Sequence, residues 1–243
     1  MTSNPCGKGN GLGACFIPPV WPFTDGTIWS GPAFSIQTDV WEHEYGHFIT
    51  WTYGDLNYSC TANYEEGKVL AEAWANLFGE VSAVMDGSLN PDYGALKKFD
   101  NTGAPAAENT TTVFNTPPSF YLQFHFVDCG ADPHTQERPL EQAIWELLFN
   151  RNCDAFDGFA TCTDSLGFYT GTINAVFPGS SQSSVAVLIA RAEAYAMQQD
   201  PYYNSTVVDT ELYFGDYLKA HTSAQDYTNV VYLFGKHNLN YMP

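Results

Sequence analysis

The residues with the clearest chemical potential are His43, Glu44 and His47, in the segment His43-Glu44-Tyr45-Gly46-His47. On a helix, two histidines four positions apart project from one face, with Cβ atoms about 5–6 Å apart. Both imidazoles can then reach one zinc ion at about 2.0–2.1 Å. Glu44 can face a water molecule on that ion without binding the metal itself. The spacing therefore predicts a single Zn²⁺ held by the two histidines, with Glu44 as general base.

A catalytic zinc site needs a third protein ligand and one open position. The metzincin solution, a histidine six residues after His47, is excluded because that position is Tyr53. Three glutamates lie within reach farther along the chain: Glu65, Glu66 and Glu72. We favour Glu72, because it lies inside a predicted helix and a helix holds a ligand more rigidly than a helix entrance does. Asn76 follows one turn later and is placed to orient a ligand histidine.

The elements that must position these residues are predicted to be mainly α-helical. Apolar residues recur at three and four positions from Ile36 to Trp51, and Gly54 ends this run. Further helices are predicted over 68–85 and 137–150 and near 182–199, 207–221 and 224–236. Residues 1–34 are rich in Gly, Pro and Cys and are predicted to be irregular, whereas 86–118 resemble a long loop. The expected fold is a helical bundle around the zinc site with little sheet, α+β at most.

Residues 39–79 resemble the zinc core of the thermolysin and fungalysin families of zinc peptidases. His43-Glu44-Tyr45-Gly46-His47 is similar to the fungalysin form of the motif, which has Tyr at its third position. Ala71-Glu72-Ala73-Trp74-Ala75-Asn76-Leu77-Phe78-Gly79 resembles the thermolysin-like Asn-Glu-Ala-x-Ser-Asp-x-Phe-Gly. The resemblance implies a gluzincin with a zincin-like catalytic half, in which His43, His47 and Glu72 bind zinc and Glu44 is the base. One departure is Asn76, which stands where these families have Asp.

A second block, in which His134 precedes the predicted helix 137–150, resembles the same families. There the resemblance implies that His134 donates a hydrogen bond to the developing oxyanion. An exposed loop histidine near a helix start is the alternative interpretation of this residue. Tyr58 aligns with a tyrosine that assists in thermolysin. We expect His125 to pack in the core, and His221 and His237 to cap helices or face solvent.

The composition describes one globular domain over residues 1–243. We divide it into an irregular segment 1–34, zinc-binding helices within 36–85 and a helical part over 119–243. A formal charge of −18, from 27 acidic and 9 basic residues, disfavours nucleic acid and anionic membranes as partners. The longest aliphatic run, 185–190, is too short to span a membrane. We expect a monomer that acts on protein or peptide substrates.

The six cysteines contain no Cys-x-x-Cys pair, which favours disulfides in an oxidising compartment. The simplest pairing is Cys6–Cys15, Cys60–Cys129 and Cys153–Cys162. Three Asn-x-Ser/Thr sites also fit a secreted protein. Excess acid leaves Ca²⁺ open as a second cofactor. A cluster of Asp154, Asp157 and Asp164 is either a calcium loop or a solvated acidic loop.

These features predict a secreted zinc endopeptidase that hydrolyses peptide bonds through a zinc-activated water. The alternative is a non-catalytic, zinc-stabilised module that binds a partner protein, that is, a degenerate metallopeptidase. Glu44 favours the enzyme, because zinc binding alone does not require it. The short N-terminal part favours the module, since only 42 residues precede His43 and thermolysin-type enzymes carry a large β-rich lobe there.

Overall fold

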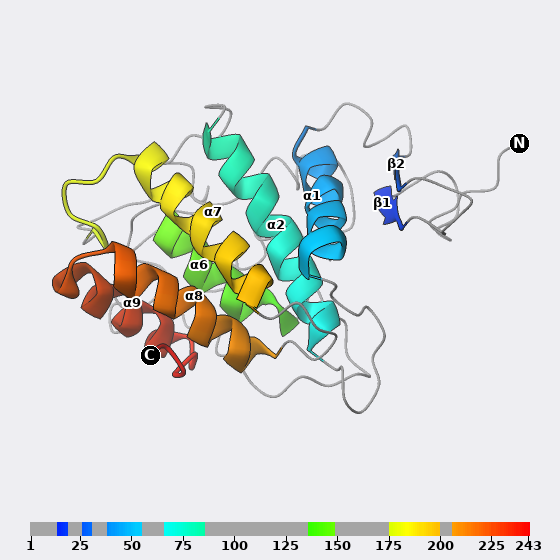
Figure 1. The fold of residues 1–243 in the computed structure, drawn as a ribbon. Helices are drawn as coiled ribbons and strands as arrows, with labels where there is room; N and C mark the ends of the chain where they lie inside the picture. The colour runs from blue at the N-terminus through cyan, green and yellow to red at the C-terminus, as the bar shows by residue number, and fades with distance from the viewer. Residues whose placement is uncertain are drawn as a thin grey trace, which may run out of the picture.

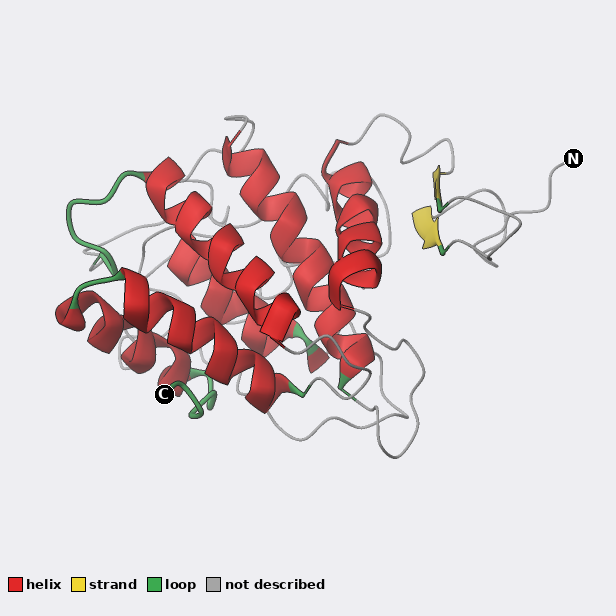
Figure 2. Cartoon of the chain, viewed as in Figure 1, coloured by secondary structure: helices red, strands yellow, loops and turns green. Residues whose placement is uncertain are grey.

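The computed structural model describes residues 14–18, 26–30, 38–54, 66–85, 136–148, 175–199 and 206–243. Helices dominate these residues, as Figures 1 and 2 show, which confirms the mainly α fold. The helices are α1 (Thr38–Ile49), α2 (Gly67–Met85), α6 (Arg138–Leu148), α7 (Gln182–Gln199), α8 (Val207–His221) and α9 (Ala224–Lys236). A π-helical turn, η2 (Thr50–Gly54), extends α1 to the glycine that was predicted to end it.

The prediction of an irregular N-terminal segment is wrong for two short stretches. Strands β1 (Ala14–Ile17) and β2 (Thr27–Ser30) form an antiparallel pair in which Cys15 lies opposite Trp29. Phe16 of β1 packs edge to face on Phe48 of α1, with ring centroids 5.9 Å apart. The pair lies beside α1 in Figure 1. Four residues per strand are too few for alternation to emerge from a Gly- and Pro-rich background, so the pairing is visible only in three dimensions.

Helix α2 contains the centre of the core. Its small and large apolar residues are buried on several sides, including Leu70, Ala71, Ala73, Trp74, Ala75 and Leu77. A helix that is apolar around most of its circumference must be enclosed by neighbours. Helices α1, α6 and α7 all contact it. The helix that carries Glu72 is therefore held from several directions.

Helices α7, α8 and α9 complete the core on the C-terminal side. Phe214 of α8 lies between Trp74 of α2 and Phe234 of α9, with centroid distances of 6.0 Å to each. Two of these helices begin at a capping hydroxyl: Thr206 accepts from the Asp209 amide at 3.0 Å, and Ser223 accepts from the Asp226 amide at 3.1 Å. Such caps satisfy first-turn N–H groups, which explains why the predicted and observed starts of α8 and α9 agree.

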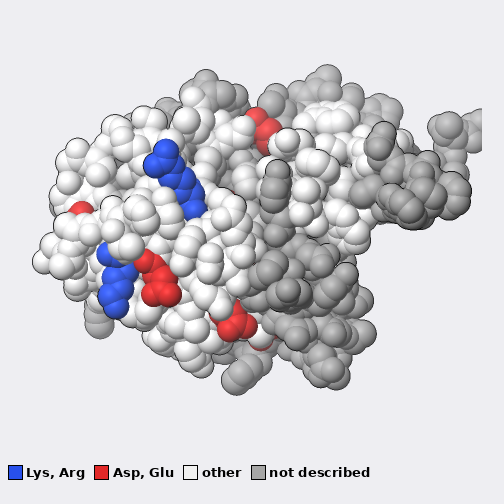
Figure 3. Space-filling model, in the orientation of Figure 1, with Lys and Arg blue, Asp and Glu red and all other residues white. Residues whose placement is uncertain are grey.

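Charged side chains on the described surface are scattered and of both signs on the face drawn in Figure 3. Part of the acid excess lies inside the protein instead. Among the described residues, six glutamates are buried: Glu44, Glu137, Glu141, Glu146, Glu193 and Glu211. Buried carboxylates are uncommon unless they are paired, so their surroundings indicate where the chain uses them. No described helix is long and apolar enough to cross a membrane.

Candidate metal centre

Helices α1 and α2 lie side by side and run in opposite directions (Figure 1). Ser82 donates to the Glu42 carboxylate at 2.7 Å, and one residue later in α1 but six residues earlier in α2, His43 contacts Asn76. The helices approach each other closely at Gly46. A Cβ atom at this position would lie 2.7 Å from Cα and 2.9 Å from the carbonyl oxygen of Ala75. The absence of a side chain at Gly46 therefore lets the histidine-bearing helix approach the Glu72-bearing helix closely.

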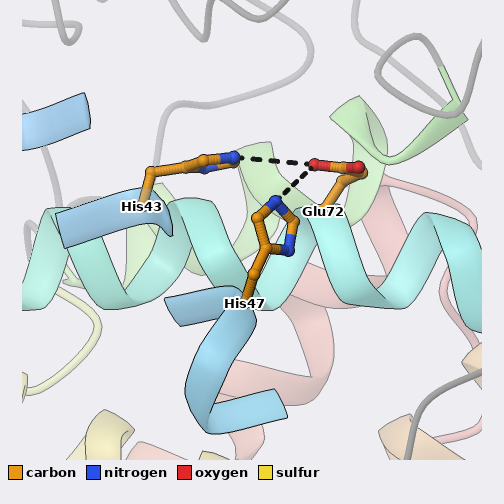
Figure 4. A group of neighbouring side chains, drawn as sticks. All are labelled: His43, His47 and Glu72. Atoms are coloured by element: carbon orange, nitrogen blue, oxygen red, sulfur yellow. Dashed lines mark ion pairs between the residues drawn. The ribbon is translucent and has the colours of Figure 1, made fainter. Parts of the chain in front are cut away.

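Three donor side chains converge between these helices. His43 and His47 project from α1 and Glu72 projects from α2, and Figure 4 shows all three directed toward one point. The Glu72 Oε2 atom lies 3.1 Å from His47 Nε2 and 3.6 Å from His43 Nε2. The three side chains are only 8–12% exposed. In the described part of the chain, no other group of three or more His, Cys, Asp or Glu side chains has its ligand atoms close enough together to hold a metal ion.

The donor set fits a metal ion in number, type and spacing. Two ligand atoms about 2.0–2.1 Å from a tetrahedral ion lie about 3.3–3.4 Å apart. The distances from Glu72 Oε2 to the two histidine Nε2 atoms, 3.1 and 3.6 Å, lie on either side of this value. Two imidazoles and one carboxylate are also the donors of catalytic zinc sites that keep a fourth position open. We conclude that His43, His47 and Glu72 can bind a metal ion.

The orientation of His43 is set by a hydrogen-bonded chain. Its Nδ1 atom lies 2.6 Å from Oδ1 of Asn76, and Nδ2 of Asn76 donates to Oε1 of Glu137 at 3.3 Å. Because an amide oxygen only accepts, His43 carries its proton on Nδ1. In the neutral form of the ring, Nε2 is then the nitrogen that can bind a metal ion, and it lies 3.6 Å from Glu72 Oε2. Asn76 thus contacts a ligand histidine, as the sequence predicted.

Glu44 is buried next to the donor group and is 6% exposed. Its charge contributes to a raised pKa of His47. Burial by itself lowers the pKa of His47, but the charges of Glu72, Glu44 and Glu137 outweigh it and raise that pKa above its usual range. The centre therefore carries enough negative charge to favour a cation, whether a proton or a metal ion. Removing that charge one carboxylate at a time would weaken the attraction for either cation.

The structure distinguishes Glu72 from Glu66 as the candidate third ligand. Glu72 reaches the histidines, whereas Glu66 accepts a hydrogen bond from the Val207 amide at the start of α8. Glu66 therefore satisfies an otherwise unpaired first-turn N–H of another helix. Glu65, Tyr58 and His134 lie outside the described residues, so the role expected of His134 stays a prediction.

Two residues of the centre, Gly46 and Glu137, are not identified from the sequence. In the sequence, Gly46 is only one position of the motif, but a glycine inside a helix and between two ligand residues is a signal of close packing. Glu137 was treated only as the start of a helix. No local pattern joins it to Asn76, because 61 positions separate them and only tertiary packing brings them together.

The other sequence-based expectations are tested in part. Cys15, the one cysteine among the described residues, is disulfide-bonded. Its proposed partner Cys6 and the other two proposed pairs lie outside those residues, as do His125 and the cluster Asp154, Asp157 and Asp164. His221 is exposed and stacks on Tyr217, as expected. His237 is the C-cap of α9, which confirms the first of the two roles expected of it, but it does not face solvent: its ring is buried, with Nε2 3.8 Å from Glu146 Oε2.

Comparison of the chain with models of protein families, with curated proteins and with solved structures finds no match. The case for a function therefore rests on the residues of the centre and their geometry.

Proposed function

We propose that the chain is a zinc-dependent endopeptidase of the gluzincin type. One observation carries the proposal: a buried glutamate, Glu44, follows the first histidine of a three-donor group formed by His43, His47 and Glu72. Metal binding needs the three donors but does not need Glu44. A carboxylate beside a divalent ion is, however, what hydrolysis by an activated water requires.

Each residue has a stated task in this proposal. His43 and His47 bind through Nε2 and Glu72 binds through its carboxylate, which leaves a fourth position for water or substrate. When bound, zinc supplies Lewis acidity, which acidifies water and polarises a carbonyl group. Glu44 accepts a proton from the attacking water on its carboxylate and passes it to the nitrogen of the leaving amine. His134 is proposed to donate to the oxyanion.

The test compares the wild-type protein with Glu44→Gln. Glutamine keeps the shape of the side chain and cannot accept the proton. We expect both proteins to bind one zinc ion by elemental analysis and only the wild type to cleave casein, in a reaction that a chelator stops and zinc restores. Loss of one general base is expected to lower turnover by about 10²–10⁴-fold.

Two outcomes would contradict the proposal. Near-normal cleavage by Glu44→Gln would remove the proposed base. Zinc binding without cleavage in the wild type, on casein and on a mixed peptide library, would favour the alternative of a zinc-stabilised protein-binding module. His134→Ala gives a further test, because it should keep zinc and lower kcat by about 10²–10³-fold, with a smaller change in KM.

Secretion and the three-disulfide pairing are proposed with this activity. The disulfide at Cys15 supports an oxidising environment. Peptide mapping without reduction should find no free thiol and should recover the pairs Cys6–Cys15, Cys60–Cys129 and Cys153–Cys162. A different connectivity would refute the pairing and leave the metal centre unaffected.

A further inference from the structure

We infer that Glu137 is a positioning residue of the metal centre, which acts on the ligand His43 through the side-chain amide of Asn76. The inference rests on the proposed metal site, but it does not depend on whether that site is catalytic. The juxtaposition that carries it joins three segments: α1 supplies His43, α2 supplies Asn76, and the residue before α6 supplies Glu137.

The chain of contacts is continuous and buried. His43 Nδ1 lies 2.6 Å from Asn76 Oδ1, and Asn76 Nδ2 lies 3.3 Å from Glu137 Oε1. The three residues are 6%, 4% and 1% exposed. Hydrogen bonds in such surroundings polarise one another, because little water is present to screen them. Negative charge on Glu137 therefore strengthens the bond that Asn76 accepts from His43.

Glu137 supplies the negative charge that Asn76 lacks. A metal-binding histidine becomes a better ligand when its second nitrogen donates to a carboxylate, but Asn76 is neutral. Glu137 places a carboxylate on the far side of the same amide. The amide then transmits orientation directly and part of the charge indirectly, so that His43 keeps Nε2 free for the metal.

Glu137 is also held in a place that suits an anion. Its backbone carbonyl accepts the Glu141 amide at 3.0 Å, so the residue immediately precedes helix α6 and is hydrogen-bonded to its first turn. The N-terminal end of a helix carries partial positive charge, which stabilises a nearby carboxylate. The backbone of Glu137 is therefore fixed by the helix while its side chain reaches across to α2.

The chain provides a matched control on the same helix. Glu141 lies one turn after Glu137, is 3% exposed and has the same side chain. It takes no part in the described bonds to Asn76 or His43. We expect Glu137→Gln to weaken zinc binding by about 10–100-fold, the usual loss when the outer partner of a ligand is changed. Glu141→Gln should change zinc affinity by less than about threefold on the same reasoning.

The experiment is a competition titration of each protein with Zn²⁺ and a chromophoric chelator, with folding checked by circular dichroism. A double variant, Asn76→Asp with Glu137→Gln, keeps one carboxylate in the chain but moves it onto the residue that contacts His43. It should recover most of the affinity lost in Glu137→Gln, which a merely structural role for Glu137 would not predict. The double variant also remains informative if the single variant folds poorly.

Three results would overturn the inference: equal zinc affinity in Glu137→Gln and the wild type, equal losses in Glu137→Gln and Glu141→Gln, or no recovery in the double variant. The failure of the proposed function is separate. If the wild type binds zinc and Glu137→Gln weakens it, the inference holds even when neither protein cleaves a peptide. If the wild type binds no zinc, the site itself is absent and both ideas fall.

Discussion

Two regions of the molecule bury carboxylates and use them differently. In the metal-facing region, formed by α1, α2 and the start of α6, Glu72 meets two histidines and Glu137 meets an amide. In the C-terminal region, formed by α7, α8, α9 and residues 237–243, Glu211 accepts the Tyr241 amide at 2.9 Å. There the carboxylate fastens the end of the chain to α8. A buried carboxylate alone, or one beside a single histidine such as Glu146 beside His237, therefore does not mark a metal site. The metal-facing group differs because one carboxylate converges with two histidine nitrogens.

The two regions also differ where a glycine lets two segments of the chain approach each other closely. At Gly46 a side chain would meet the backbone of Ala75 on a neighbouring helix. At Gly215 of α8 it would meet Pro243 and Met242, which belong to the chain end. The first contact is with the backbone of the other ligand-bearing helix, whereas the second is with side-chain atoms. The metal-facing region should tolerate change less well than the C-terminal region.

The largest expected effect is the loss of metal affinity in Glu72→Ala. Because changing an outer partner alone costs about 10–100-fold, loss of one of three ligands should weaken zinc binding by more than about 100-fold. The measurement is the zinc dissociation constant by chelator competition. Glu66→Ala is the control and should retain zinc, since its carboxylate bonds to Val207. Loss of zinc in the control with retention in Glu72→Ala would reverse the assignment.

The second effect is the instability of Gly46→Ala. Alanine favours a helix over glycine by about 1 kcal/mol. The added Cβ would nevertheless lie 2.7 Å from Ala75 Cα, and separating the helices should cost more than that gain. We expect a net loss of about 1–3 kcal/mol in the free energy of unfolding, measured in urea. Zinc affinity should fall as well, because the ligands on α1 move away from Glu72.

Gly215→Ala is the matched substitution in the C-terminal region. Its new Cβ would lie 2.5 Å from Pro243 Cδ and 2.6 Å from the Met242 sulfur, and its three nearest neighbours are all side-chain atoms. We expect a smaller loss of stability than in Gly46→Ala and no change in zinc affinity. Equal losses in the two variants would show that the two close approaches are equally rigid.

The third effect concerns the stability of α8 in Glu66→Ala. The Val207 amide loses its carboxylate acceptor and becomes an unsatisfied first-turn donor. Loss of a comparable helix cap costs about 0.5–2 kcal/mol in the free energy of unfolding. Thermal and urea unfolding of the metal-free protein would measure it. An unchanged stability would mean that water replaces Glu66 without cost.

The smallest effect is a change of pH dependence in Glu211→Gln. Burial, with a further contribution from the charge of Glu66, raises the pKa of Glu211 from 4.5 to about 7, although the Tyr241 amide opposes this. A raised pKa means that the folded state holds the proton more tightly, so this group contributes stability below pH 4.5 that is lost as the pH rises through about 7. Glutamine stays neutral throughout.

Unfolding in urea at pH 5, 6, 7 and 8 would test this prediction. Relative to Glu211→Gln, the wild type should become progressively less stable as the pH increases over this range. Parallel pH profiles for the two proteins would contradict the assignment of a raised pKa to Glu211.

The sequence by itself determined the features that depend on neighbouring residues. Helices near 182–199, 207–221 and 224–236 were predicted from the sequence and correspond to α7, α8 and α9, because helix formation is local. The structure adds that Thr206 and Ser223 cap α8 and α9. The pairing of His43 with His47 is also local, since one helical turn separates them.

Only the tertiary structure decided which distant partners meet. Glu66 and Glu72 lie close in sequence, but six residues correspond to about 240° around a helix axis, so they face different neighbours. Packing directs Glu66 to α8 and Glu72 to the histidines. It also brings Glu137 to Asn76 and pairs β1 with β2. Periodicity defines which side of an element is apolar, but the element that covers that side is chosen by the fit of the whole core.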